Sequence, residues 1–445
     1  MSIGSFILAF IEQYAGFGQR LFDAYILFSR PLLDVFHAFF DALFYGLLGV
    51  AVVLSVIYGV MSLYSIFARK GKEPAFIEER APKVTVQIPT FNELAALRCA
   101  QACLAFDYPK EKVQIIIGDD SDNLEISARI ADFAKENSLL VTRRGSNEGY
   151  KAGNLNSMLA RSTGDILVIF DSDFVPEPDF LRRIVAPFIH SASVSAVQAR
   201  WKFLDSNRNV VTVLGSTIVS VFHHICLPFL HGHSKISFLC GSAEAVRKSD
   251  VLALGEWESG SLTEDIEYSL RLFKAGKRIL YLDTLECAGE VPHTTKDLYK
   301  QQMRWAYGVI ASFQKHAKEL YGSARVTFKD KFYISFFCTG YFLSFLLLSL
   351  FVTGTLSFFT DKPAPIDLVK FISHMGVNTL LTSGIILASF VALYKVKNLR
   401  KTFVMIGASF SVGLMVTYYV NVGILKVLFG QKMPWFMLNK DGNKL

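Results

Sequence analysis

Residues 164–174 read GDILVIFDSDF, and this stretch decides the fold class of the chain. The apolar run from Ile166 to Phe170 predicts a buried central strand, which ends at two carboxylates, Asp171 and Asp173. Because a strand projects residues i and i+2 to the same side, both acids can face one point beyond its carboxyl end, where open α/β sheets bind ligands. Two close carboxylates repel each other unless a cation lies between them, and a divalent ion that escorts a phosphate meets this need. The alternative is an ordinary polar strand end followed by a turn.

The composition is typical of a membrane-associated protein. Of the 445 residues, 51% are hydrophobic and the mean hydropathy is +0.34, which is too apolar for a wholly soluble chain. The net charge of +7 is modest and the basic residues are scattered, so no nucleic-acid partner is expected. The six Cys show no metal-ligand spacing, and we expect reduced thiols in a protein that faces the cytosol.

The N-terminal part predicts membrane contact of two kinds. Residues 1–40 alternate large apolar residues with isolated polar ones, which indicates an interfacial helix pair broken at Pro31. Residues 41–68 are apolar enough and long enough to cross a bilayer. The basic cluster from Arg69 to Lys72 then predicts that the following residues lie in the cytosol.

Residues 84–323 predict a cytosolic α/β domain. Segments such as KVTVQIP, VQIIIGDD and DILVIFDSD have the composition of strands, and helical segments such as LEISARIADFAKENS separate them. This alternation predicts a mainly parallel, Rossmann-like sheet with helices on both faces.

The C-terminal part predicts further membrane helices. Residues 332–360 and 375–394 each have the length and hydropathy of a membrane crossing. Residues 402–430 are also apolar, but a third crossing would place the basic tail, residues 431–445, outside the cell. We therefore expect an interfacial or re-entrant helix on the cytosolic leaflet and a cytosolic tail.

Four further motifs in the α/β domain place polar residues at strand ends or helix starts. QIPTFNE carries Pro89, Thr90, Asn92 and Glu93; IIIGDDSDN carries Asp119 and Asp120, one of which could accept hydrogen bonds from a nucleobase; NEGYKAGNLN carries Lys151, a cation suited to phosphate; and SLTEDIEYSLRL carries Glu264 and Asp265. Taken singly, each is more typical of a capped helix or an ordinary turn than of a binding site. Their joint occurrence in this order is specific.

Together with Gln301-Gln302-Met303-Arg304-Trp305, which matches the motif Q-x-x-R-W, these segments resemble membrane-embedded family-2 glycosyltransferases of the cellulose synthase-like group. The resemblance covers residues 84–310 and, by layout, the flanking membrane segments. It implies a nucleotide-sugar-binding GT-A fold and an inverting transfer. It favours a UDP-sugar as the donor and leaves a GDP-sugar as the alternative.

The resemblance also implies roles for individual residues. Asp120 or Asp119 would hold the uracil, with Pro89, Thr90, Asn92, Glu93 and Lys151 on the donor side, while Asp171 and Asp173 would bind the diphosphate through Mg²⁺ or Mn²⁺. Asp265 would be the general base that takes the proton from the acceptor hydroxyl. Arg304 would contact the pyrophosphate, and Glu264, Gln301 and Trp305 would lie on the acceptor side. The alternative for Trp305 is a membrane-interface anchor.

The tail sequence PWFMLNK resembles the gating loop of cellulose synthases. It keeps an aromatic residue, Trp435, and the lysine, Lys440, but has Leu438 at the usual threonine position, so gating is a hypothesis.

The predicted function is processive synthesis of a β-linked polysaccharide that passes through the plasma or inner membrane. A first alternative is a glycolipid synthase that adds one sugar to a lipid acceptor such as ceramide, diacylglycerol or polyprenyl phosphate. A second is a receptor or scaffold with an inactive domain. The sugar and the oligomeric state stay open.

Overall fold

The computed structural model describes residues 3–68, 71–234, 236–362, 367–439 and 442. The chain folds into two compact units. The smaller comprises residues 1–56 and 345–383, and the larger comprises residues 57–344 and 384–445.

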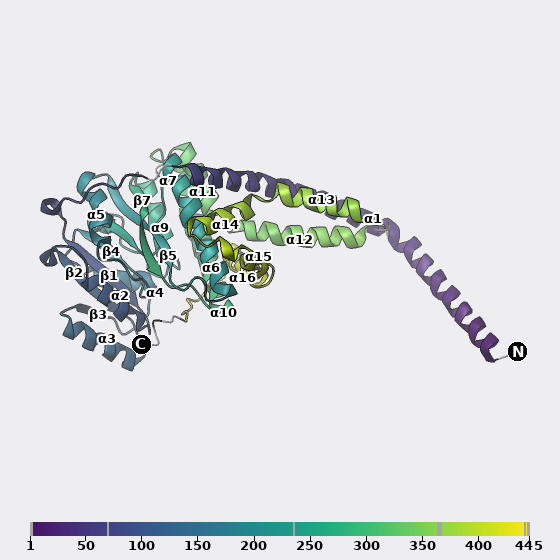
Figure 1. The fold of residues 1–445 in the computed structure, drawn as a ribbon, viewed down its shortest axis with the longest axis horizontal. Coiled ribbons are helices and arrows are strands. Elements are labelled where there is room, and N and C mark those ends of the chain that lie inside the picture. Colours follow the sequence, from purple (N-terminus) through teal and green to yellow (C-terminus); the bar gives the residue numbers. More distant parts are fainter. Residues whose placement is uncertain (1–2, 69–70, 235, 363–366, 440–441, 443–445) are drawn as a thin grey trace. The chain divides into compact units, whose positions relative to one another are not determined.

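One seven-stranded sheet forms the centre of the larger unit among the described residues, in the order β3-β2-β1-β4-β6-β5-β7 (Figure 1). The strands are β1 (Val84–Thr90), β2 (Val113–Asp119), β3 (Leu140–Arg143), β4 (Ile166–Ile169), β5 (Val194–Phe203), β6 (Glu244–Arg247) and β7 (Arg278–Gly289). Neighbouring strands are parallel, except that β6 runs antiparallel to both β4 and β5. The prediction of a mainly parallel α/β sheet is confirmed.

Two apolar layers bury both faces of this sheet. In β4, Ile166 and Val168 belong to one layer, and Leu167 and Ile169 belong to the other. Helices α2 and α5 cover the first layer and α4 and α9 cover the second, which explains why the central strands are continuous apolar runs. The helices of this domain are α2 (Ala95–Leu104), α3 (Leu124–Glu136), α4 (Tyr150–Leu159), α5 (Phe180–His190), α6 (Val210–Val221), α7 (Leu227–Ser234), α8 (Lys248–Ala253), α9 (Glu264–Lys274) and α10 (Thr295–Gly322).

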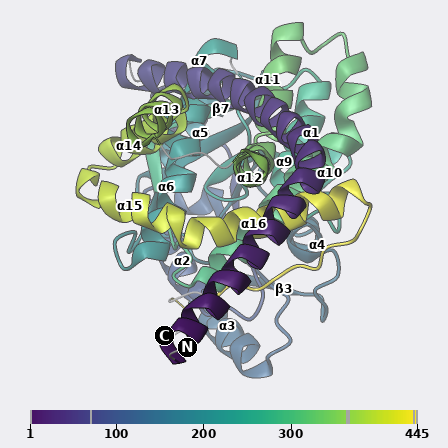
Figure 2. The same cartoon turned by 90° about the vertical axis from the view of Figure 1, so that its right-hand side faces the viewer.

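The remaining helices are largely apolar. They are α1 (Ile3–Phe67), α11 (Phe328–Cys338), α12 (Phe342–Thr360), α13 (Leu368–Leu381), α14 (Gly384–Lys395), α15 (Thr402–Phe410) and α16 (Val412–Leu428). Among the described residues, three helical stretches are long and apolar enough to cross a membrane, namely Leu27–Phe67, Val210–Ser234 and Phe342–Thr360. The number rises to five if each of two bent pairs, α13 with α14 and α15 with α16, is one span. The bend in the second pair, 53°, is visible in Figure 2.

Several predicted helix boundaries differ from those in the structure. The break at Pro31 does not occur, because α1 continues through this residue, whose missing N–H removes only one bond from a 65-residue ladder. The single helix predicted over 332–360 is instead two helices, α11 and α12, separated at Gly340. At this break the Ser335 carbonyl accepts both the Thr339 N–H, at 2.9 Å, and the Thr339 hydroxyl, at 2.8 Å.

The segment predicted to cross at 375–394 is also divided. The structure has α13 and α14 there, bent by 58°. The expected helix at 402–430 is the α15–α16 pair, and α16 packs Val416, Val420 and Ile424 against Leu298 and Ile310 of α10. A bent pair of this kind is compatible with a broken span and with a re-entrant segment.

Within the smaller unit, polar groups of α1 bind the end of α12. Arg30 donates to the carbonyls of Thr360 and Asp361 at 3.1 and 3.0 Å, and His37 Nδ1 lies 3.0 Å from the Ser357 carbonyl. Ionisable groups in apolar helices require such partners, so these contacts explain why α1 tolerates them.

Candidate active site

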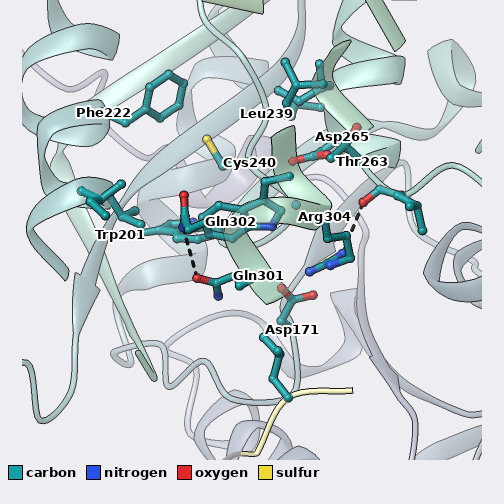
Figure 3. Close-up of a pocket in the computed structure, with 18 of the residues that line it drawn as sticks. Asp171, Trp201, Phe222, Leu239, Cys240, Thr263, Asp265, Gln301, Gln302 and Arg304 are labelled. Atoms are coloured by element: carbon teal, nitrogen blue, oxygen red, sulfur yellow. Dashed lines mark hydrogen bonds between the residues drawn. The ribbon is translucent and has the colours of Figure 1, made fainter. Parts of the chain in front are cut away.

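A cavity of about 530 Å³ lies at the carboxyl ends of β1, β2 and β4 in the larger unit. Side chains from distant parts of the chain line it: Pro89, Thr90, Glu93, Asp120, Lys151, Asp171, Asp173, Glu264, Asp265, Gln301, Arg304, Trp305 and Trp435. Figure 3 shows Asp171, Asp265, Gln301 and Arg304 around it. Two of the predicted donor-side residues, Asn92 and Asp119, do not line this cavity.

Asp171 and Asp173 lie in a turn beyond the strand. Because β4 ends at Ile169, the two-residue alternation of a strand does not orient these carboxylates. The Asp171 N–H instead donates to Ser242 Oγ at 2.9 Å, and Asp173 Oδ2 accepts the Glu290 N–H at 3.1 Å. Tertiary contacts therefore orient the Asp171 and Asp173 carboxylates toward the cavity.

The two carboxylates fit a hard divalent cation, because their oxygens are the ligands that Mg²⁺ and Mn²⁺ favour. Within the part of the chain that the structure describes, no group of three or more His, Cys, Asp or Glu side chains could hold a metal. An ion here would need oxygens from a bound diphosphate to complete its shell.

Lys151 lies at the centre of the acidic cluster. Its Nζ is 2.7 Å from Asp171 Oδ1 and 2.9 Å from Glu264 Oε1, and it donates to the Gly241 carbonyl. Burial alone would lower the pKa of this amine, but the charges of Asp171 and Glu264 outweigh that effect and raise the pKa. Lys151 is therefore a fixed cation that links the Asp171 carboxylate to Glu264 at the start of α9.

Asp265 is the second residue of α9 and faces the same cavity. Burial raises its pKa to about 7, and the neighbouring charge of Glu264 acts in the same direction, whereas Lys151 opposes the shift. A carboxyl group with this pKa is suited to accept a proton near neutral pH.

If Asp265 is the general base that the sequence predicts, catalysis should decline on the acidic side of pH about 7. A base accepts a proton only when it is ionised, so kcat/KM should fall about tenfold for each pH unit below the pKa of Asp265. Initial rates measured between about pH 5.5 and 8.5 at saturating metal test this expectation. A constant rate across this interval would contradict the assignment of Asp265 as the base.

The two acids at the end of β2 have different environments. Asp120 lines the cavity and forms a two-point ion pair with Arg144, in which Nε donates at 2.9 Å and Nη2 pairs with Oδ2. Burial raises the pKa of Asp120, and Arg144 opposes this. Asp119 is fully buried and accepts hydrogen bonds from the Ser121 N–H and the Ser127 hydroxyl. Of the two, only Asp120 can reach a ligand.

We expect Arg144→Met to destabilise the protein by about 3 kcal/mol, because it leaves the buried Asp120 carboxylate without its positively charged partner. Thermal unfolding in detergent measures this loss, and Arg129→Met, at an exposed arginine on α3, is the matched control. Adding Asp120→Asn to Arg144→Met should restore part of the stability, since the unpaired charge is then removed. Equal unfolding temperatures for Arg144→Met and Arg129→Met would contradict the role of the pair.

The two polar residues in the loop after β1, Asn92 and Glu93, point in different directions. Glu93 lies in the cavity wall and accepts a hydrogen bond from the Ser172 hydroxyl, next to the Asp171 and Asp173 carboxylates. Asn92 points elsewhere: its Nδ2 donates to Asp122 at 2.6 Å and its Oδ1 accepts the Asn123 N–H at 3.1 Å. Asn92 thus joins two loops rather than lining the site.

Helix α10 supplies the opposite wall, with Gln301, Arg304 and Trp305. The Trp305 ring lies 6.3 Å from that of Trp201, which also lines the cavity but was not predicted. Trp201 lies near the carboxyl end of β5, so only its aromatic type in this position could have indicated it. Arg304 donates to the Leu262 carbonyl at 3.3 Å, which places its guanidinium beside the start of α9 (Figure 3).

The C-terminal tail reaches the cavity. Trp435 packs against the rings of Phe91 and Tyr150, with centroids 5.7 and 6.4 Å apart. The other proposed gating residue, Lys440, lies outside the described residues.

Comparisons with known proteins define the class. The model of the family described as glycosyltransferase-like family 2 matches residues 82–308, and the chain belongs to this family. It is 30% identical over 350 residues to a relative named "Probable glucomannan 4-beta-mannosyltransferase 1" from Arabidopsis thaliana, which covers 71% of this chain and 63% of the relative. It is 32% identical over 270 residues to glucomannan 4-beta-mannosyltransferase 2 of the same plant, covering 58% of this chain and 50% of the relative. The chain thus spans 63% of the length of the first relative and 50% of the length of the second.

A solved structure shares the fold. The mannosyltransferase PcManGT from Pyrobaculum calidifontis, in complex with GDP-Man and Mn²⁺, has a TM-score of 0.60 at 16% sequence identity. The match covers 90% of this chain and all of that one. The sheet and its helices are therefore the GT-A fold of glycosyltransferases, as predicted.

Proposed function

We propose that the protein is an inverting, metal-dependent membrane glycosyltransferase that elongates a β-linked polysaccharide with mannosyl units from a nucleotide sugar. One observation carries this proposal: a single cavity collects Asp120, the Asp171–Asp173 pair, Asp265 and the Gln301–Arg304–Trp305 wall. These are the acids and the aromatic face that such a transfer requires.

In this proposal the acceptor hydroxyl loses its proton to Asp265 as its oxygen attacks the anomeric carbon. The bond from that carbon to the diphosphate oxygen breaks, and the nucleoside diphosphate leaves with the electron pair. Asp171 and Asp173 would hold Mg²⁺ or Mn²⁺, which neutralises charge on the leaving diphosphate. One base suffices, because a single displacement forms no covalent enzyme intermediate.

The relatives' names support mannose as the transferred sugar, since both are called glucomannan 4-beta-mannosyltransferases. The archaeal enzyme of similar fold was solved with GDP-Man and Mn²⁺, so we propose GDP-mannose as the donor in place of the UDP-sugar expected from the motifs. In the larger unit, Asp120 is the acid that would contact the base of either nucleotide.

The acceptor side of the proposal rests on the aromatic wall and on the apolar helices. Trp201, Trp305 and Phe222 also line the cavity, and flat rings of this kind suit the faces of sugar units. We propose that the catalytic domain faces the cytosol and that the product enters or crosses the plasma or inner membrane. The helices that could span a membrane support this arrangement.

Incubation of purified protein in membranes with labelled GDP-mannose, GDP-glucose, UDP-glucose and UDP-N-acetylglucosamine, each with Mn²⁺, tests the proposal. We expect label from GDP-mannose in a high-molecular-weight product that an endo-β-mannanase degrades. Label confined to a chloroform-soluble product would instead support the glycolipid synthase. No transfer from any donor by a protein that binds none of the nucleotides would refute the enzyme assignment.

A further inference from the structure

The 240–243 loop, which leads into β6, has an unusual backbone. Gly241 has φ of +85° and Ala243 has φ of +52°. The left-handed region is costly for a residue with a Cβ, so Ala243 keeps this conformation only because its surroundings impose it. A strained backbone that borders a candidate site indicates that the surrounding structure holds the loop in one particular shape.

This loop contacts four parts of the proposed active site. The Gly241 carbonyl accepts a hydrogen bond from Lys151, and Ser242 Oγ accepts the Asp171 N–H at 2.9 Å. The Ser242 carbonyl accepts the Trp201 Nε1–H at 2.9 Å. A Cβ built on Gly241 would lie 3.3 Å from Asp265 Oδ2, so the backbone passes directly beside the proposed base. Figure 3 shows Cys240 between Trp201 and Asp265.

A buried carboxylate holds the loop in this shape. Glu244 Oε2 accepts the N–H of Gly241 at 2.9 Å, and it shares the N–H of Cys240, at 3.2 Å, with Gln198 Oε1, which lies 2.8 Å from that nitrogen. Glu244 is 1% exposed and is the first residue of β6, where it pairs with Ile169 of β4 and Gln198 of β5. The carboxylate therefore extends from the rigid centre of the sheet to the loop.

We propose that Glu244 is a positioning residue for the transfer reaction, which fixes the 240–243 loop through two backbone N–H groups and so sets the spacing between Asp265, Lys151 and Asp171. This inference rests on the proposed function of the same site. A buried side chain on a central strand can hold its partners with little freedom, as the alignment of a base with an acceptor hydroxyl requires. The family resemblance extends over the segment CGSAEAVRKS, which contains Glu244, but it assigns no role to this residue.

The electrostatics of Glu244 support a role through geometry rather than charge. Burial raises its pKa to about 8, and the charge of Asp265 acts in the same direction. A protonated carboxyl group still accepts both N–H groups, because its carbonyl oxygen keeps its lone pairs. The amide of Gln would do the same.

Two substitutions of Glu244 separate the effect of side-chain length from the effect of charge. Glu244→Gln keeps the length and the acceptor oxygen without the charge, whereas Glu244→Asp keeps the charge but withdraws the oxygens by about 1.5 Å. We expect Glu244→Gln to retain kcat within about threefold of the wild type and Glu244→Asp to lose about a hundredfold in kcat, with nucleotide affinity within about threefold in both. Glu244→Met, which fills similar space without an acceptor, should be impaired like Glu244→Asp. Glu319→Asp, at a 69% exposed side chain on α10, is the matched control.

Amide hydrogen exchange of the 240–243 peptide provides a readout that is independent of turnover. We expect exchange to be faster in Glu244→Asp and Glu244→Met than in the wild type or Glu244→Gln. The unfolding temperature of the protein should be the same in all four. Wild-type kcat in Glu244→Asp and Glu244→Met, or a hundredfold loss in Glu244→Gln, would overturn the proposal. If the wild type transfers no sugar from any donor, the proposed function fails, whereas equal exchange rates in all variants refute the role of Glu244 itself.

Discussion

Asp265→Asn is expected to lower kcat by about a thousandfold while nucleotide-sugar affinity stays within about threefold of the wild type. The Asn amide fills the same space, and its oxygen can still accept the Ile266 N–H at the start of α9. It cannot, however, take the proton from the hydroxyl of the acceptor sugar. Steady-state transfer rates measure kcat, and titration calorimetry with GDP-mannose and Mn²⁺ measures the affinity. Asp132→Asn, at an exposed residue of α3, is the matched control and should leave both quantities unchanged.

The neighbouring acid provides the main competing assignment. Glu264 forms an ion pair with Lys151 at 2.9 Å and its side chain is only 7% exposed, so it is poorly placed to reach an incoming hydroxyl. Glu264→Gln should therefore retain more activity than Asp265→Asn. The reverse order, with near wild-type rates in Asp265→Asn, would transfer the role of base to Glu264.

Asp173→Asn is expected to weaken nucleotide-sugar binding about a hundredfold in the presence of Mn²⁺ and to leave metal-free binding unchanged, because a charged metal ligand contributes several kcal/mol. The amide oxygen of Asn can still accept the Glu290 N–H, so the turn should keep its shape. Calorimetry with and without chelator separates the two contributions. Asp179→Asn, at a 56% exposed side chain, controls for the loss of one charge.

Identical affinities for the wild type and Asp173→Asn in saturating Mn²⁺ would show that this carboxylate is no metal ligand. Calorimetry with and without chelator should also be done on Asp171→Asn, because that substitution removes the ion pair with Lys151 as well. We expect Asp171→Asn to alter binding in both the presence and the absence of metal.

Much of the cavity wall was predictable, because several of the motifs that line it lie at the end of a locally recognisable strand. The apolar runs before Pro89, Asp120 and Asp171 mark β1, β2 and β4, and the carboxyl ends of neighbouring parallel strands meet at one edge. The Asp265 position was predictable for a similar reason, since acidic residues favour the first turn of a helix such as α9.

Other features depend on contacts that no local pattern contains. The choice of Asp120 over Asp119 depends on Ser127 and Arg144, which bind one acid each from later elements. The orientation of Asn92 depends on the loop at Asp122. The break at Gly340 lies inside a continuous apolar run, so hydropathy could not reveal it.

By itself, the sequence determined the α/β class, the order of the strands along the chain, the apolar helices and the acids at the strand ends, because periodicity and composition act over neighbouring residues. Only the tertiary structure decided which of those acids share a cavity, that Lys151 lies between Asp171 and Glu264, and that Glu244 holds the loop beside Asp265. The physical reason is that a side chain's direction and partners are set by packing between elements distant in the chain. The free energy that fixes them comes from burial and hydrogen bonds formed only when the whole sheet assembles.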